Sequence, residues 1–485
     1  MRVTGGHLRR GRIVLTAGVV LGLSLPALAS ATASAGSSGP AAAGAQLWVS
    51  QYNGPANSFD GARAEAVSPT DGTVFVTGPS DAANGEADYA TVAYNPATGD
   101  QLWVTRYNGP GNALDEPEAI GVSPDGGTVF VTGFSAGATS LDYATIAYSA
   151  TTGAQLWIQR HAGAGQAPSE AKALVVSHNG SAVYVTGYSA NQYFTVAYNA
   201  TTGARLWSRG YADGSISQAR SIAISPNDKA IYVTGRSGFS PYNFDDATVA
   251  YNAATGARMW VSRYNGLDNS KANGSEFAND ITVGPGGQTV YITGGSSGRT
   301  SDTDFTTIAY KASTGAQLWI SRYNGSGNLI DDGFALAITP NGRTVVATGP
   351  SWGKGSNADH STNTDYATIA YDASTGATRW VKRYSGVPDG YDGDNPFGVV
   401  ISPDGATAYV TGESDSLHTE DDYATVAYSV ATGARLWVSR YDGPDHSFDG
   451  AAALALSPSG NALYVVGGDT GITSEDDFGT VAYQT

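Results

Sequence analysis

Three of the six histidines fall in segments that the sequence predicts to be loops, and each has carboxylates nearby. Imidazole nitrogens and carboxylate oxygens are common metal ligands, and Ca²⁺ takes several oxygens. The candidate metal ligands are His360, His418, His446, Asp389, Asp392 and Asp394. The run from Asp389 to Asp394 lacks the Asp-x-Asp-x-Asp-Gly order of a calcium loop, which favours solvated loop residues over a metal site. Ca²⁺ is the one ion that these residues suggest, and no other cofactor is predicted.

Aromatic residues stand in the same class of loops. The candidates for ligand binding are Trp352, Phe239, Tyr242 and Tyr391. Aromatic rings beside carboxylates and amides could stack on a sugar or contact a protein partner. They could equally pack against their own strands, and both interpretations stay open.

Two further positions carry an acid at regular intervals along the chain. The first is Asp88, Asp142, Asp246, Asp304, Asp365, Asp422 and Asp477; the second is Asp60, Asp115, Asp331, Asp394 and Asp449. Both positions are expected on one face of the molecule, where a ring of carboxylates could hold cations. Their regular placement favours a structural role, in which each Asp accepts hydrogen bonds from its own loop.

No catalytic residue is predicted. The chain has no cysteine, and it contains no Gly-x-Ser-x-Gly, His-Glu-x-x-His, phosphate-loop or dinucleotide motif. Its many carboxylates would allow an acid–base pair to be drawn almost anywhere, so they identify none.

An internal repeat supplies the elements that position these residues. Its skeleton, Ala-x-(polar)-x-x-Thr-Gly-x-x-x-Trp, runs from Ala93 to Trp103 and recurs along the chain. Within one unit, residues 61–108, strand-like runs occupy 64–67, 73–78, 89–94 and 101–107, separated by Gly, Pro, Asn and Asp. Four antiparallel strands repeated eight times predict an all-β fold, an eight-bladed β-propeller.

Side-chain size predicts the order of strands within a blade. The first run of each unit is rich in Ala, Val and Ile, which suits the crowded axis, and the fourth carries Trp, which suits the outer rim. The chain would then begin with an outer strand and end with a third strand. The ring is therefore expected to close by pairing the N-terminal outer strand with the C-terminal three strands.

The N-terminus has the pattern of a secretory signal peptide, predicted as residues 1–35, with a Gly/Ala/Ser-rich linker at 36–44 and the propeller at 45–485. A basic start precedes an apolar run, and cleavage is expected after Ala35 or Ala29. Pro26 breaks the run, which is too short for a membrane anchor. Export removes four arginines and no acid, so the net charge falls from −17 to −21. Such a charge disfavours nucleic acid and anionic lipid as partners.

The repeat resembles the tryptophan-docking motif of quinoprotein alcohol dehydrogenase-like propellers, the pyrroloquinoline quinone repeat family. Its Val-Ser-Pro-Asp-Gly and Val-Phe-Val-Thr-Gly segments resemble repeats of exported bacterial propellers. The resemblance implies eight blades, and a Trp that packs on the motif Gly of a neighbouring blade. The family's enzymes place an adjacent Cys pair over the cofactor, and this chain has none. Their calcium-binding Glu and Asn and their catalytic Asp have no match here either.

The sequence therefore predicts a secreted, monomeric binding or scaffold protein without enzymatic activity, whose acidic loop face binds a protein or a glycan. One alternative is a polysaccharide-directed lyase or hydrolase with a bound cation. Another is a degenerate quinoprotein oxidoreductase.

Overall fold

The computed structural model describes residues 41–240, 243–266, 275–298, 301–353, 364–387, 393–416, 420–471 and 476–485. Residues Ala41–Thr485 form one compact unit. In its described part, the only helix is the short 3-10 turn η1, Ala164–Gln166. No helix there is long and apolar enough to cross a membrane.

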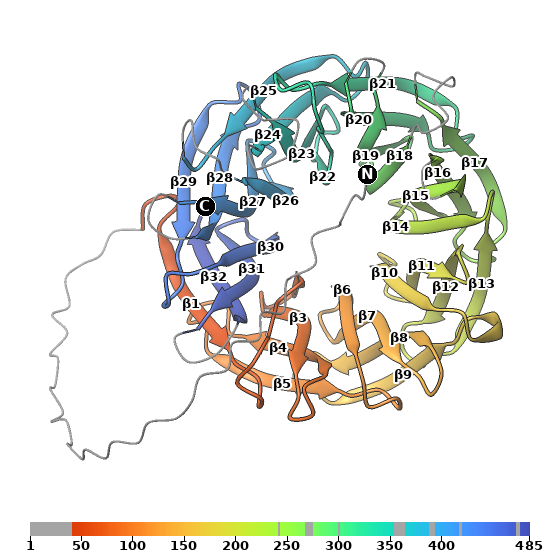
Figure 1. Cartoon of the computed structure of the whole chain (residues 1–485), viewed down its shortest axis with the longest axis vertical. Helices are drawn as coiled ribbons and strands as arrows, with labels where there is room; N and C mark the ends of the chain where they lie inside the picture. The colour runs from red at the N-terminus through yellow and green to blue at the C-terminus, as the bar shows by residue number, and fades with distance from the viewer. Residues whose placement is uncertain are drawn as a thin grey trace, which may run out of the picture. The chain divides into compact units, whose positions relative to one another are not determined.

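Thirty-two strands form eight four-stranded antiparallel sheets that follow one another around a ring (Figure 1), which confirms the eight-bladed propeller. The first four blades are β2 (Ala64–Val67), β3 (Val74–Asp81), β4 (Ala87–Tyr94), β5 (Gln101–Tyr107); β6 (Asp115–Val122), β7 (Thr128–Ala136), β8 (Leu141–Ser149), β9 (Gln155–His161); β10 (Ser169–Val176), β11 (Ala182–Ser189), β12 (Gln192–Asn199), β13 (Arg205–Tyr211); β14 (Ile216–Ile224), β15 (Ala230–Ser240), β16 (Asn243–Asn252), β17 (Arg258–Tyr264). The last four are β18 (Glu276–Val283), β19 (Thr289–Ser297), β20 (Thr303–Lys311), β21 (Gln317–Tyr323); β22 (Ala335–Ile338), β23 (Thr344–Trp352), β24 (Thr364–Asp372), β25 (Thr378–Tyr384); β26 (Asn395–Ile401), β27 (Thr407–Asp415), β28 (Asp421–Ser429), β29 (Arg435–Tyr441); β30 (Asp449–Leu456), β31 (Ala462–Thr470), β32 (Asp476–Gln484) with β1 (Gln46–Tyr52).

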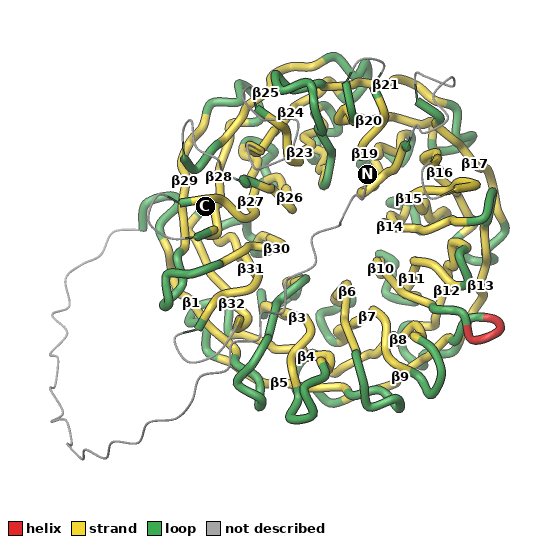
Figure 2. The backbone as a smooth tube through the Cα atoms, in the orientation of Figure 1, coloured by secondary structure: helices red, strands yellow, loops and turns green. Residues whose placement is uncertain are grey.

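The ring closes as the sequence predicts. β1 pairs antiparallel with β32 and completes the sheet of order β1-β32-β31-β30, so the eighth blade contains both ends of the propeller. The first strand of each blade lies nearest the axis and the Trp-bearing strand lies outermost (Figure 2). β3 differs from its prediction, because its ladder with β4 continues past Gly78 to Asp81.

The hydrophobic core is divided among the junctions between blades. The described residues contain eight clusters of buried apolar side chains, and each cluster joins two neighbouring sheets. The third strand of a blade is buried on both faces, as in β4, which explains its nearly continuous run of Ala, Val and Tyr.

The tryptophan motif joins successive blades, as the resemblance implies. Gly99 has φ +75°, and a Cβ built on it would lie 2.6 Å from Trp48 Cε3 of the preceding blade. Only glycine tolerates both this conformation and this contact. The indole of Trp157 donates a hydrogen bond to the carbonyl of Ala200 at 2.9 Å, and those of Trp48, Trp103, Trp207, Trp260, Trp319 and Trp380 bond likewise.

Arginines make a second connection between blades. Arg322 of the fifth blade donates to the Tyr264 hydroxyl of the fourth at 2.7 Å, and it also pairs with Asp304 at 3.1 Å. Arg106, Arg160, Arg383 and Arg440 make the same contact with a tyrosine of the preceding blade. The Arg-Tyr pair of the repeat is thus a blade-to-blade contact.

Candidate functional site

The connections that lead from an outermost strand to the next blade, and from a second to a third strand, share one face of the propeller, called here the loop face. Arginine–aspartate pairs neutralise much of its charge. They are Arg106–Asp88, Arg160–Asp142, Arg263–Asp245, Arg322–Asp304, Arg383–Asp365 and Arg440–Asp422, at 2.5–3.2 Å. In the fourth blade Asp245 forms the pair, and the predicted Asp246 is its buried neighbour.

The second acidic position closes its own loop. Asp60, Asp115, Asp331 and Asp449 each accept a hydrogen bond from a glycine N–H six residues earlier, at 2.5–2.6 Å. In most blades a serine lies opposite this residue on the second strand, as Ser80 does for Asp60. These bonds support the structural role expected for regularly placed aspartates.

The eighth blade departs from this arrangement at two positions at once. Gln51 occupies the register position that an arginine occupies in six other blades, and Asp469 lies opposite Asp449 where the others place serine. One positive charge is lost and one negative charge is added at the same spot. Gln51 Nε2 and the Tyr441 hydroxyl donate to Asp469 Oδ2 at 2.7 and 2.6 Å. Asp469 Oδ1 is buried and has no hydrogen-bond partner among the described residues.

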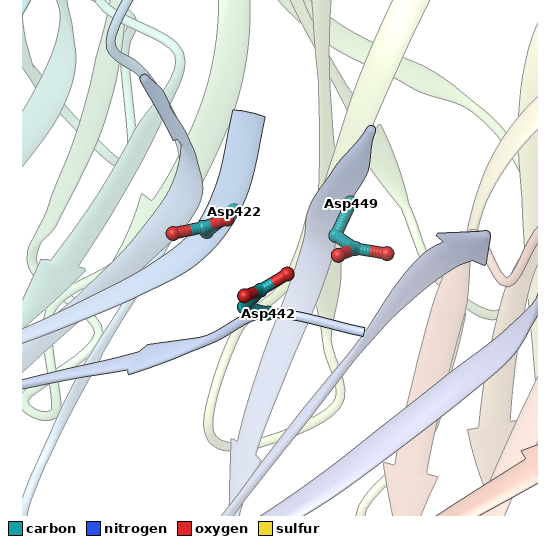
Figure 3. Close-up of side chains that lie close together, drawn as sticks. All are labelled: Asp422, Asp442 and Asp449. Atoms are coloured by element: carbon teal, nitrogen blue, oxygen red, sulfur yellow. The ribbon is translucent and has the colours of Figure 1, made fainter. Parts of the chain in front are cut away.

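Four carboxylates gather where the seventh and eighth blades meet, and we call Asp422, Asp442, Asp449 and Asp469 the carboxylate cluster. Asp422, Asp442 and Asp449 each place an oxygen within 4.8 Å of the others (Figure 3). They come from the start of β28, the residue after β29 and the start of β30. Asp469 and Asp449 also converge, since a Cβ on Gly443 would lie 2.3 Å from Oδ1 of the one and 2.6 Å from Oδ1 of the other.

Burial sets the electrostatics of the cluster. It raises the pKa of Asp449 and of Asp469, because a carboxylate loses solvation there and its acidic neighbours repel it. Asp442 lies at the rim with 32 % of its side chain exposed. A cation bound at this point would relieve the repulsion, and the donors are all oxygens, which suits a hard ion.

Of the predicted metal ligands, His446 lies beside the cluster. Its Nδ1 is 2.7 Å from Asp442 Oδ2, and this contact raises the pKa of the imidazole. Asp394 is fully buried and accepts a hydrogen bond from Gly386 N–H at 3.0 Å, like the loop-closing aspartates. His360, His418, Asp389 and Asp392 lie outside the described residues.

The predicted aromatic ligands are also divided. Phe239 in β15 is 74 % exposed, and Trp352 is the half-buried last residue of β23, paired with Thr364. Tyr242 and Tyr391 lie outside the described residues. The structure does not bring Phe239 and Trp352 into a described contact, so a shared aromatic site stays a prediction.

Sequence reasoning missed the carboxylate cluster as a unit, although Asp422 and Asp449 stood in the two predicted rings. The signal was the pair of exceptions, Gln51 and Asp469, which appears once the repeats are aligned by strand. The third blade shows a similar coordinated exception. Gly210 replaces the arginine, and the preceding blade has His161 in place of tyrosine, with its ring stacked on Phe194 at 3.9 Å.

Comparison with known proteins agrees with the fold. The family model described as outer membrane protein assembly factor BamB matches residues 38–263, 88–354, 245–390 and 303–477. No curated protein matches the sequence.

Several solved propellers are similar in structure. Chaetomium thermophilum Sqt1, bound to the N-terminus of ribosomal protein L10, has 11% identity and a TM-score of 0.59, over 90% of this chain and 98% of that one. The quinohemoprotein alcohol dehydrogenase of Comamonas testosteroni has 14% identity and a TM-score of 0.57, over 90% and 76%. A europium-containing methanol dehydrogenase has 13% identity and a TM-score of 0.55, over 90% and 93%. At these identities the likeness concerns the fold alone.

Proposed function

The chain belongs to the family described as outer membrane protein assembly factor BamB, a family of pyrroloquinoline quinone-type propeller repeats, and we propose that it is an exported, non-enzymatic binding protein whose loop face binds a protein or a glycan. The fold is a ring of eight blades, and the loops that connect their strands form the loop face. Among similar propellers, Sqt1 binds a protein segment. Loops on a rigid scaffold are the usual place for recognition.

One observation carries the proposal: the carboxylate cluster has more acids than cations. Arg440 pairs with Asp422, whereas Gln51 stands where Asp469 and Asp449 would otherwise face an arginine. Carboxylates that have no arginine partner attract a cationic group, and a basic segment of a partner protein would supply one. The exposed Asp445 beside Asp442 extends the negative charge toward solvent.

A polycation tests this surface. Fluorescently labelled poly-L-lysine should bind the protein at low ionic strength, and Asp442→Asn/Asp445→Asn should weaken binding roughly threefold to tenfold, since exposed charge pairs contribute roughly 0.2–1 kcal/mol each. Fluorescence anisotropy measures the affinity. The matched control is Asp100→Asn, an exposed acid in the β4–β5 turn on the opposite face. Equal losses in both variants, or binding that does not respond to salt, would contradict the proposal.

The close approach of three carboxylates also favours a second candidate, a Ca²⁺ ion held by Asp422, Asp442 and Asp449. Ca²⁺ takes about 6–8 oxygen ligands at about 2.3–2.6 Å, and a glycan hydroxyl could complete such a shell. Titration with CaCl₂ in a calorimeter should give one binding event that Gln51→Arg weakens by placing a positive charge beside Asp469. No heat, and no thermal shift in the wild-type protein, would exclude this candidate.

A further inference from the structure

A second charged site lies on the innermost strands and on the second strands paired with them, away from the carboxylate cluster. Several of these strands have a register shift near their start, for example between Ala171 and Ala173 of β10 and between Ala219 and Ser221 of β14. The extra residue at the shift meets the corresponding residue of the next blade. The residues at this position in the first five blades are Arg63, Glu118, Lys172, Arg220 and Asn279.

Charges alternate along the first part of this series and are matched there. Arg63 pairs with Glu118 at 3.5 Å and with Glu116 at 2.5 Å. Lys172 pairs with Glu118 at 2.7 Å and with Glu170 at 3.0 Å. Each of these cations therefore has two carboxylate partners across or within a blade.

The match ends at the fourth blade, where two arginines stand together. Arg220 donates to the amide oxygen of Asn279, and Arg236 donates to Gln218 Oε1 at 2.9 Å. Among the residues that the structure describes, neither guanidinium forms a salt bridge. Partial burial lowers the pKa of Arg236, and the charge of Arg220 lowers it further, so the two groups repel each other. Burial lowers the pKa of Arg220 and the carboxylate of Asp332 acts against this shift, but no salt bridge joins the two among the described residues.

Both arginines face a cavity of about 480 Å³ between the third and fourth blades. Lys172, Tyr188, Gln218 and Glu170 share its lining. Small-molecule pockets commonly measure about 300–1,000 Å³ and combine a few convergent polar groups with an apolar wall. The rings of Phe277 and Phe244 lie under Arg220 and Arg236, at 5.7 and 4.7 Å, and hold the guanidinium groups in place.

We propose that this cavity binds a sugar acid, with the carboxylate between Arg220 and Arg236 and the hydroxyls on Gln218, Tyr188 and Glu170. A guanidinium matches a carboxylate with two parallel hydrogen bonds, which satisfies the donors that the protein leaves over. Gln218 and Glu170 offer oxygen acceptors, and Tyr188 offers a ring edge and a hydroxyl, the set that a polyhydroxylated ring needs. The site is separate from the loop-face cluster and does not depend on it.

A carboxylate suits this cavity better than a phosphate does. A phosphate monoester carries about −1.5 to −2 charges at neutral pH, against −1 for a carboxylate. Glu170 and Glu118 lie close by, and the whole chain has a net charge of −17. A second negative charge would therefore meet repulsion that a single one largely avoids.

Titration of the full-length protein with D-galacturonate and D-glucuronate, followed by ligand-observed NMR or calorimetry, tests the site. At least one of them should bind, and Arg220→Gln and Arg236→Gln should each weaken binding about tenfold or more. Arg343→Gln is the matched control, because Arg343 lies in a turn on the opposite face and forms no salt bridge in the described part of the chain. Melting curves of all variants check that they are folded.

Ligands that carry only part of a sugar acid, or a phosphate in place of its carboxylate, test which groups the cavity recognises. Galactose should bind at least tenfold more weakly than galacturonate, and acetate should also bind more weakly, because each lacks one half of the recognised group. Glucose 6-phosphate or inorganic phosphate binding as tightly as the sugar acids would overturn the assignment to a carboxylate. Binding that survives unchanged in both arginine variants, or no binding of either sugar acid, would overturn the site itself. These outcomes leave the poly-L-lysine test of the loop face unaffected.

Discussion

Single substitutions within a repeat create the charged surfaces of this protein. At the loop face, Gln51 and Asp469 replace an arginine and a serine, and the surrounding hydrogen bonds are otherwise those of every blade. Beside the axis, Arg220 of β14 and Arg236 of β15 form no salt bridge among the described residues, whereas Arg63 and Lys172, which occupy the position of Arg220 in other blades, pair with glutamates. In both cases the strand pairing is that of the other blades, including the register shift at Arg220, so the charges change without a change of fold.

The tryptophan–glycine contact is the residue-scale feature with the clearest energetic test. Gly99→Ala should lower the free energy of unfolding by about 2–4 kcal/mol, because the new Cβ adopts a left-handed backbone and clashes with Trp48. Chemical denaturation followed by tryptophan fluorescence measures the loss.

Gly85→Ala separates the two causes of that loss. Gly85 has φ +78°, close to that of Gly99, but a Cβ built there meets no atom within 4 Å. Its substitution should cost about 1–2 kcal/mol, the backbone part alone. Equal losses at the two positions would mean that the tryptophan contact adds nothing to stability.

At the scale of elements, strands and closure could be predicted from the sequence because each leaves a local pattern. The Val-, Tyr- and Thr-rich runs mark the strands, and the split copy of the motif at the two ends marks the eighth blade. The carboxylate cluster left no such pattern. Gln51 and Asp469 are 418 residues apart and meet only because β1 closes the ring.

Register errors explain most of the remaining differences between prediction and structure. Asp88 lies five residues before Ala93 of the motif, and the residue five before Ala250 is Asp245. The predicted Asp246 was therefore wrong by one residue, and Asp245 forms the pair with Arg263. The register shifts in the innermost strands could not be predicted from the sequence either, because a β-bulge adds one residue of no fixed type. They nevertheless decide that Lys172 and Arg220 project beside their counterparts in neighbouring blades.

For the molecule as a whole, the net charge does not show where the charged side chains lie. The acidic surplus of −17 is concentrated partly in buried or half-buried carboxylates that close loops and join blades. Arg220 and Arg236, which form no salt bridge among the described residues, therefore make a local positive patch in an acidic protein. A ring built from eight similar units can hold an acidic site at one junction and a basic site at another, because each junction has its own core.

The buried carboxylates also predict how the stability of the whole protein depends on pH. Burial raises the pKa of Asp60 to about 6, of Glu276 to about 7 and of Asp332 to about 8. In the unfolded chain these groups titrate near pH 4, so between about pH 4 and 8 the folded state binds more protons than the unfolded state does. Stability should therefore fall as the pH rises through this window and level off above it. Below about pH 4 stability should fall again as the pH falls. Hydrogen bonds from Ser374 lower the pKa of Asp372 in the folded protein, so in this range the unfolded chain binds a proton that the folded protein does not.

The free energy of unfolding should consequently be greatest near pH 4, which urea denaturation at intervals from about pH 3 to 9 can establish. Glu276→Gln removes one raised pKa and should flatten the decline between about pH 5 and 7, since a neutral amide is isosteric with the protonated acid. Asp100→Asn alters an exposed acid and should leave the profile unchanged. A stability that rises steadily from pH 5 to 8 would contradict the assignment, because it would require the buried acids to be more acidic in the folded protein than in the unfolded chain.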